Sequence, residues 1–188
     1  WCNYNCRWCT RITLCLCHSG QVINLNKYDK PLLMLLIVDN GSIFIKNITD
    51  FLSSIQVQHY TKTFDDIDIL ELKQIDSVIL SGRRHNNQDM NAINSKIIQN
   101  CISQKKPLLG ICYGAEILAL TVGGTIRRMP SLQKGHSSVQ IKKNNPLCGG
   151  IIDVYQSHNF EISQLGKHLT QIADSNYCKY EIIQYEEL

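Results

Sequence analysis

The feature that most constrains the fold of this chain is a short apolar strand that runs into a glycine-flanked cysteine and then into a helix. The segment PLLGICYGAE covers residues 107–116, and Gly110 and Gly114 stand two residues on either side of Cys112. A side chain presented on a sharp strand-to-helix turn needs very small neighbours at these two places, because Cβ atoms there would collide with the flanking strand and helix. The pattern therefore predicts a nucleophile elbow that carries a cysteine.

Such an elbow would give the cysteine chemistry as well as position. It would lift the sulfur to the carboxyl edge of the sheet, where open α/β sheets place their sites. The N-terminus of the next helix favours a thiolate, and the backbone amide of Tyr113 would form half of an oxyanion hole. The alternative for Cys112 is an inert buried cysteine, which is a common state of free cysteines. We expect that inert state for the cysteines that lack this setting, which are Cys101, Cys148 and Cys178.

Strand and helix patterns alternate through the first half of the chain. Continuous apolar runs predict parallel strands buried on both faces, and apolar residues at helical spacing predict the helices between them. The predicted strands cover residues 32–38, 56–61, 77–80 and 107–111. The predicted helices cover residues 44–52, 93–102 and 115–122. This order predicts an α/β fold with an open, mostly parallel sheet flanked by helices.

The second half has a different pattern, with short strand-like segments and no long helix between them. These segments cover residues 125–129, 138–142, 151–155, 169–173 and 179–185. We expect them to form a small mixed or antiparallel extension in the second half of the chain.

The distribution of charge and the length of the apolar runs argue against two classes of partner, nucleic acids and membranes. The net charge of +3 arises within residues 1–33, and residues 34–188 hold 15 basic and 15 acidic side chains. A neutral domain has no electrostatic basis for binding nucleic acid. The longest apolar run, residues 31–38, is far shorter than the roughly 20 residues that span a bilayer, and we see no secretory signal. We therefore expect a cytoplasmic protein that binds neither nucleic acid nor membranes, in a reducing compartment that keeps its thiols free.

Residues 1–33 differ from the rest because they are rich in cysteine. Three of these cysteines have the spacing C-x3-C-x2-C, which could hold three irons of a four-iron cluster and resembles the cluster loop of radical S-adenosylmethionine enzymes. They are Cys2, Cys6 and Cys9. A zinc site is another alternative, with a ligand from Cys15, Cys17 or His18. The interpretation we favour is that residues 1–33 are a disordered or non-native extension, that the domain covers residues 34–188, and that it holds no metal.

Several segments together resemble the class I glutamine amidotransferases. PLLGICYGAEILA resembles their nucleophile segment, and LLIVDNGS resembles their first strand and loop, especially in the glutaminase subunits of GMP synthetases. SVILSG resembles the strand that carries their second oxyanion donor. VYQSHNFEISQLG, IADSN and YEIIQYEEL resemble later segments of the same family. The resemblance spans residues 34–188 and implies a flavodoxin-like fold.

The resemblance also implies roles for particular residues. Cys112 would be the nucleophile, the backbone amides of Gly82 and Tyr113 would hold the oxyanion, and Gly110 and Gly114 would permit the elbow. Two residues would line the wall that holds the amino-acid end of glutamine, namely Ser157 and His158. The implied reaction is hydrolysis of glutamine through a thioester without a cofactor. The ammonia would go to a partner synthetase, which the resemblance suggests makes GMP.

Two departures from the family pattern leave questions open. The family usually has glutamine at the position of Glu116, whose carboxylate would raise the pKa of the thiol if it faced the site. Alternatively, Glu116 points elsewhere on the first helical turn, where an acid is favourable. The oxyanion loop, usually rich in glycine and proline, continues here as Arg83-Arg84-His85. We expect His85 to be solvated, and the two arginines either to be solvated or to contact a partner domain.

A third departure concerns the acid–base group. The family's catalytic His-Pro-Glu motif follows one more strand, and no His-x-Glu occurs in these 188 residues. We expect that the sequence is incomplete at its C-terminus or that another histidine substitutes, with His158 as the best substitute; the chain as given would then be slow or inert. Three other interpretations stay open: another cysteine hydrolase on this scaffold, a non-catalytic regulatory relative, and an iron–sulfur protein.

Overall fold

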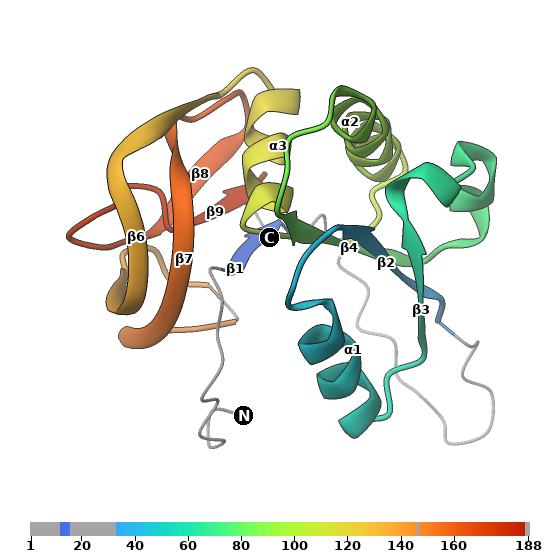
Figure 1. The fold of residues 1–188 in the computed structure, drawn as a ribbon, viewed down its shortest axis with the longest axis horizontal. Helices are drawn as coiled ribbons and strands as arrows, with labels where there is room; N and C mark the ends of the chain where they lie inside the picture. The colour runs from blue at the N-terminus through green and yellow to red at the C-terminus, as the bar shows by residue number, and fades with distance from the viewer. Residues whose placement is uncertain (1–11, 16–32, 146, 187–188) are drawn as a thin grey trace.

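The computed structural model describes residues 12–15, 33–145 and 147–186. The described residues form two β-sheets that lie side by side, with one helix, α3, at their junction (Figure 1). This arrangement confirms the predicted α/β fold with an antiparallel extension.

The first sheet has the strand order β1-β5-β4-β2-β3, and its last four strands run parallel. Its strands are β1 (Ile12–Cys15), β2 (Leu35–Asn40), β3 (His59–Thr63), β4 (Ser77–Arg83) and β5 (Leu108–Ile111). Apolar side chains fill both faces of the three central strands, as expected for parallel strands covered on both sides. Because β2, β4 and β5 run parallel, their carboxyl ends meet at one edge of the sheet.

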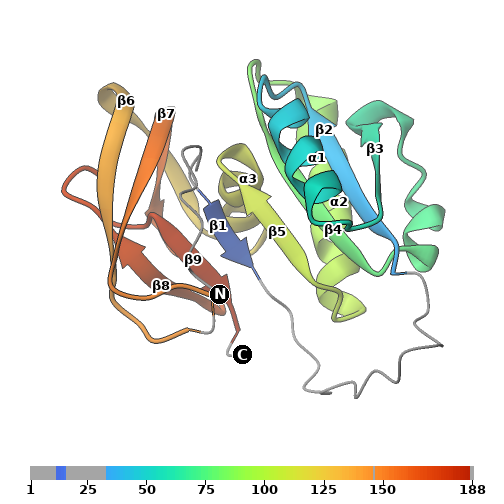
Figure 2. The ribbon, with the colours of Figure 1, turned by 90° about the horizontal axis from the view of Figure 1, so that it is seen from below.

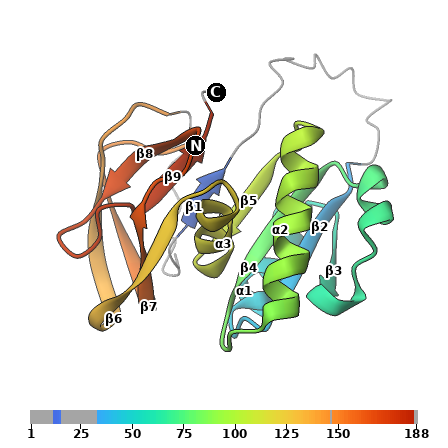
Figure 3. The same cartoon turned by 90° about the horizontal axis from the view of Figure 1, so that it is seen from above.

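Helices cover both faces of this sheet. Helix α1 (Ile45–Ser54) lies on one face, and α2 (Gln88–Ser103) and α3 (Tyr113–Thr121) lie on the other (Figures 2 and 3). Leu52 of α1 packs in one apolar cluster, and Ile97 of α2 packs in the larger one. Burying each such side chain stabilises the fold by about 1.5–3 kcal/mol. Within the described ranges, no helix is both long and apolar enough to cross a membrane.

One segment between β3 and β4 has a structure that the sequence patterns did not predict. It forms two short 3-10 helices, Phe64–Asp66 and Ile69–Gln74. The side chain of Asp68 accepts a hydrogen bond from the Leu70 amide at 2.9 Å and so caps the second of them. The buried Leu72 anchors this helix to the larger apolar cluster.

The second sheet is antiparallel and has the order β7-β6-β8-β9. Its strands are β6 (Thr125–Ile141), β7 (Ile151–Gln164), β8 (Leu169–Asp174) and β9 (Ile182–Tyr185). The prediction of separate strands at 125–129 and 138–142 is wrong, because β6 is one long strand that shifts register between Arg128 and Gln133. Strand β7 is also longer than predicted, and it carries Ser157 and His158.

Strand β1 lies within the cysteine-rich segment 1–33. It pairs antiparallel with β5, with Thr13 opposite Gly110, so it forms the edge of the first sheet, and it lies alongside β9 of the second sheet (Figures 2 and 3). Cys2, Cys6 and Cys9, as well as Cys17 and His18, lie outside the described residues. The domain boundary at residue 34 and the nature of the extension stay predictions.

Candidate active site

Cys112 occupies a strained position between the end of β5 and the start of α3. Its backbone has φ 54° and ψ −104°, a conformation that residues with a side chain rarely adopt. Its carbonyl oxygen accepts hydrogen bonds from the amides of Ala115 at 3.0 Å and Glu116 at 3.1 Å, which start the helix. Strain of this kind amounts to about 1–3 kcal/mol and persists where the surrounding structure enforces it.

The two elbow glycines lie where no side chain fits. A Cβ atom on Gly110 would lie 2.6 Å from the backbone of Gly114, and a Cβ atom on Gly114 would lie 2.4 Å from the carbonyl oxygen of Leu80 in β4. The close approach of β5, α3 and β4 thus accounts for both glycines and forces the sharp turn at Cys112.

Gly82, near the end of β4, lies next to the cysteine. A Cβ atom built on Gly82 would be 3.7 Å from the Cβ of Cys112 and 3.6 Å from the hydroxyl of Ser42, which belongs to the loop after β2. The side chain of Ser42 accepts a hydrogen bond from the Phe44 amide at 3.2 Å, and α1 begins only at Ile45. The loops after β2, β4 and β5 therefore meet around Cys112 at this edge of the sheet.

A buried polar network holds these loop ends together, and sequence reasoning missed it. The side chains of Asn40 and Asn94 exchange hydrogen bonds at 2.7 and 3.2 Å, so they tie the end of β2 to α2. The amide of Asn40 donates to the hydroxyl of Ser81 at 2.9 Å, and that hydroxyl donates to the carbonyl oxygen of Gly82 at 2.9 Å. The sequence signal that could have revealed this network is the presence of polar residues, Asn40 and Ser81, near the carboxyl ends of two apolar strands.

Two cavities meet at Cys112. The larger has a volume of about 510 Å³ and lies between the elbow, the loop after β4 and the β6–β7 hairpin; its wall includes Cys112, Tyr113 and Glu116. The smaller, of about 190 Å³, lies on the α1 side and includes Ser42 and Gly82. Both are lined by Cys112 together with Arg83, Arg84, Ser157 and His158. The larger volume is within the range of small-molecule sites.

The sequence left open where Glu116 points, and the structure places it in the wall of the larger cavity. The residue is only 5% exposed, and its Oε2 lies 4.0 Å from Nη2 of Arg83. Its carboxylate therefore faces the site rather than bulk solvent.

The side chain of Arg83 also lies in the site and is largely withdrawn from solvent. Its guanidinium carbon lies 4.1 Å from the centre of the Tyr113 ring, and its Nη1 donates to Oδ1 of Asn86 at 2.6 Å and of Asn91 at 3.1 Å. The Tyr113 hydroxyl donates to the same Asn91 oxygen at 2.8 Å. Burial raises the pKa of the Tyr113 phenol to about 12, with Glu116 adding to the rise and Arg83 opposing it, so the phenol stays a neutral donor at ordinary pH.

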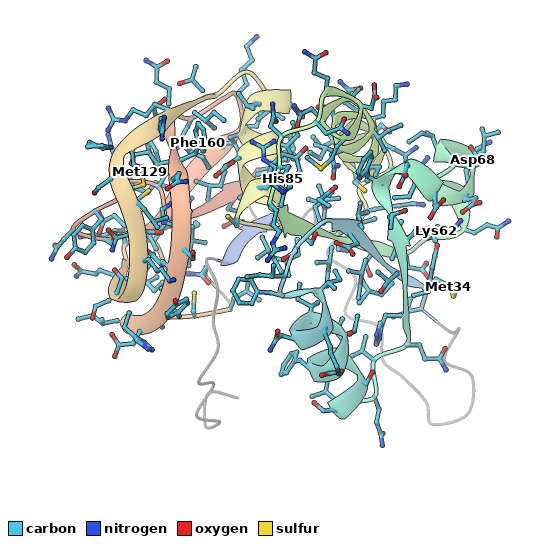
Figure 4. The ribbon with its side chains drawn as sticks, in the orientation of Figure 1. Met34, Lys62, Asp68, His85, Met129 and Phe160 are labelled. Carbon is cyan, nitrogen blue, oxygen red and sulfur yellow. The ribbon has the colours of Figure 1, made fainter. Side chains whose placement is uncertain are left out.

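The two histidines considered from the sequence have different surroundings. His158 is buried; its Nδ1 donates to the carbonyl oxygen of Phe160 at 2.9 Å, and its Nε2 lies 3.4 Å from Oε1 of Gln156. His85 is exposed on the loop between β4 and α2 (Figure 4) and lines neither cavity. Only His158 is thus brought to the cavities that Cys112 lines.

The other cysteines whose side chains the structure describes line neither of the two cavities. Cys101 is buried in the larger apolar cluster, Cys178 is buried, and Cys148 is half-buried beside Asn145. Within the described part of the chain, no group of three or more His, Cys, Asp or Glu side chains could hold a metal ion.

The chain is similar to several known proteins. The family "Glutamine amidotransferase class-I" matches residues 36–188. One subunit of the glutamine-hydrolyzing GMP synthase of Methanococcus aeolicus is 27% identical over 159 residues, which is 82% of each chain. The corresponding subunit from Thermoplasma acidophilum is 30% identical, and the match covers 80% of this chain and 76% of the relative.

Solved structures share the fold. A structure from Thermoplasma acidophilum superposes with a TM-score of 0.72 at 24% identity and covers 84% of both chains. A glutamine amidotransferase from Thermotoga maritima superposes with a TM-score of 0.67 at 15% identity, covering 84% of this chain and 76% of its own.

Proposed function

The chain belongs to the class I glutamine amidotransferases, enzymes that hydrolyse glutamine for a partner, and we propose that Cys112 is the nucleophile of this reaction. The observation that carries the proposal is the strained backbone of Cys112 at the meeting point of two cavities. Family membership favours an amidotransferase over another cysteine hydrolase on the same scaffold.

In the proposed reaction, the Cys112 thiolate attacks the side-chain amide carbon of glutamine. The backbone amides of Tyr113 and Gly82 stabilise the oxyanion, the carbon–nitrogen bond breaks, and ammonia leaves with an added proton. Water then hydrolyses the γ-glutamyl thioester to glutamate and restores the thiol. Glutamine and water are consumed, and glutamate and ammonia are formed, so the reaction needs no cofactor.

The electrostatic setting of Cys112 has opposing contributions. The N-terminus of α3 favours the thiolate, whereas the Glu116 carboxylate one turn later disfavours it. Arg83 lies beside Glu116 and offsets part of its charge. We propose that the site keeps a reactive thiolate because the arginine compensates the carboxylate.

The wall across from the elbow is formed by β7. Ser157 and His158 line both cavities, and we propose that they shape the pocket around the amino-acid end of glutamine. The hydrogen bond from His158 to the Phe160 carbonyl fixes the orientation of its ring. A ring fixed in this way suits a pocket wall.

We further propose that the ammonia is delivered to a synthetase that aminates a nucleotide, in the synthesis of GMP. The relatives named as subunits of GMP synthase support this acceptor. Ammonia released into water becomes ammonium, which is not a nucleophile, so the synthetase must dock near the cavities. A reactive thiol persists best in a reducing compartment, and we place the reaction in the cytoplasm.

The proposal is tested by covalent labelling with a chloroketone analogue of L-glutamine, followed by peptide mapping. Alkylation by the chloroketone expels chloride, so labelling does not require a group that protonates departing ammonia. We expect one labelled peptide, containing Cys112, and protection by added L-glutamine. Cys112→Ala should abolish the label, whereas Cys148→Ala, the matched control, should not. Labelling at Cys148 or Cys178 instead would contradict the proposal.

A further inference from the structure

We propose that the smaller cavity is a leaving-group subsite, which lets the site accept γ-glutamyl amides whose nitrogen carries a short neutral alkyl group, as well as glutamine itself. This inference rests on the proposed function, because it takes Cys112 as the nucleophile and places the carbon chain of glutamine in the larger cavity. It adds a class of substrate, the N-alkyl γ-glutamyl amides, and names the part of the fold that selects them.

The first support is that the reacting carbon atom lies between the two cavities. Cys112 lines both of them, whereas of the two Tyr113 lines only the larger and Gly82 only the smaller. The oxyanion of the proposed reaction contacts the backbone amides of Tyr113 and Gly82, so the carbon that bears it sits at the boundary. The same carbon bears the glutamyl chain and the nitrogen. With the chain in the larger cavity, the nitrogen lies toward the smaller one.

The second support is the volume of the smaller cavity, which is about 190 Å³. Ammonia is similar in size to a water molecule, and one water takes up about 30 Å³ in the liquid. The cavity is therefore much larger than the departing group of glutamine needs. It has room for a substituent of a few carbon atoms on that nitrogen.

The third support is the apolar wall of this cavity on the side of α1. Phe44 directly before α1, Ile48 within it and Ile111 at the end of β5 all line the cavity. Ile48 also packs against the apolar cluster that contains Ile111, and this contact holds the wall in place. Each methylene group buried against such a wall strengthens binding about fourfold. The wall therefore favours an alkyl group over water.

The fourth support is the charge of the lining. Arg83 and Arg84 line the smaller cavity, and no Asp or Glu does so among the residues that the structure describes. A cationic substituent on the nitrogen would meet two like charges there without a carboxylate to pair with, and such juxtaposition is unfavourable. The subsite therefore selects neutral alkyl groups over alkylammonium groups of the same size.

The chemistry with these amides follows that of glutamine. The Cys112 thiolate forms a bond to the amide carbon, the carbon–nitrogen bond breaks, and the alkylamine leaves with an added proton in place of ammonia. Water then hydrolyses the γ-glutamyl thioester and restores the thiol. One amide and one water are consumed, and glutamate and the alkylamine are formed, so no further reactant is needed.

The test measures how well each amide protects Cys112 from the L-glutamine chloroketone, which gives a dissociation constant even where turnover is slow. The ligands are L-glutamine and derivatives that carry methyl, ethyl, propyl or 2-aminoethyl on the side-chain nitrogen. The propyl and 2-aminoethyl groups have equal numbers of heavy atoms, but only the second is charged. We expect the propyl derivative to bind at least as tightly as L-glutamine and at least tenfold more tightly than the 2-aminoethyl derivative.

A variant at the apolar wall locates the alkyl group. Ile48→Phe fills the smaller cavity and should weaken binding of the propyl derivative at least tenfold, while L-glutamine keeps its affinity within about twofold. Ile55→Phe is the matched control, because Ile55 is exposed at the end of α1 and lines neither cavity. If Ile48→Phe fails to fold, the ligand series on the wild-type chain still decides, since exclusion of every alkyl derivative or a preference for the 2-aminoethyl derivative overturns the inference.

The outcomes also distinguish the inference from the function on which it rests. If L-glutamine protects Cys112 and the propyl derivative does not, the leaving-group subsite alone is overturned. The same holds if Ile48→Phe binds the propyl derivative as well as the wild type does, or if the chain releases ammonia from L-glutamine but no propylamine from the derivative. If L-glutamine itself does not protect Cys112, the proposed function and the inference are contradicted together.

Discussion

Gly114 packs so closely against Leu80 that a Cβ atom on the glycine would lie 2.4 Å from the leucine carbonyl oxygen. The first turn of α3 is thereby pressed onto β4, and this contact holds Cys112 at the sheet edge. Gly114 is otherwise an ordinary residue of α3, so the close contact with Leu80 is the reason that this position needs a glycine.

The first prediction follows from this contact. Gly114→Ala should lower the free energy of unfolding by about 3 kcal/mol, because the added methyl group must displace backbone rather than a flexible side chain. Urea unfolding measures the change. Gly149→Ala is the matched control, since nothing lies within 4 Å of a Cβ atom there. Equal stability of the two variants would show that α3 does not press on β4.

A second prediction concerns the paired amides of Asn40 and Asn94. Removing either side chain leaves the other buried without its partner, at a cost of about 1–3 kcal/mol. The double variant Asn40→Ala/Asn94→Ala should therefore lose clearly less stability than the sum of the single variants.

The control for this cycle pairs Asn94→Ala with Asn47→Ala, an exposed position on α1, and those two effects should add. Additivity in the Asn40–Asn94 pair as well would contradict the network. Urea unfolding of the six proteins gives the comparison.

A third prediction uses the buried phenol of Tyr113. Its pKa is raised from 10.0 to about 12 in the folded state, so between pH 10 and 12 the folded chain holds a proton that the unfolded chain has released. The free energy of unfolding should fall with rising pH across this window. Tyr113→Phe should show a smaller fall, and Tyr177→Phe, at an exposed tyrosine, should behave as the wild type. Identical slopes for all three proteins would exclude the shift.

The elbow could be predicted from the sequence because it depends on local sterics. Gly110 and Gly114 must be small for any strand-to-helix turn of this kind, and the flanking apolar runs identify the strand and helix. The parallel arrangement of the central strands could be predicted from the alternation of strand-like and helix-like segments along the chain. The structure shows the same local cause, because a Cβ atom built on Gly110 would lie only 2.6 Å from the backbone of Gly114.

Long-range relationships could not be predicted. Arg83 and Glu116 are 33 positions apart, and a charged loop residue is usually solvated, so only the fold reveals their meeting. Strand β6 was divided in the prediction because Pro130 and Gly135 interrupt its pattern, yet the strand continues through a register shift. Strand β1 is only four residues long, too short to stand out as a pattern.

The last prediction concerns Gly82, where an added methyl group should affect the reaction at Cys112 but not the stability of the fold. A methyl group there would meet Ser42 and Cys112 at 3.6–3.7 Å, which is ordinary van der Waals contact, so Gly82→Ala should fold with nearly wild-type stability. It would nevertheless occupy space beside the Cys112 side chain, where the oxyanion of the proposed reaction must fit. We expect labelling of Cys112 by the L-glutamine chloroketone to slow about tenfold or more, since small misplacements at a reacting centre have effects of this size. The urea midpoint and the labelling rate, compared with Gly149→Ala, give both readouts; an unchanged labelling rate would mean that the substrate approaches the sulfur from the other side.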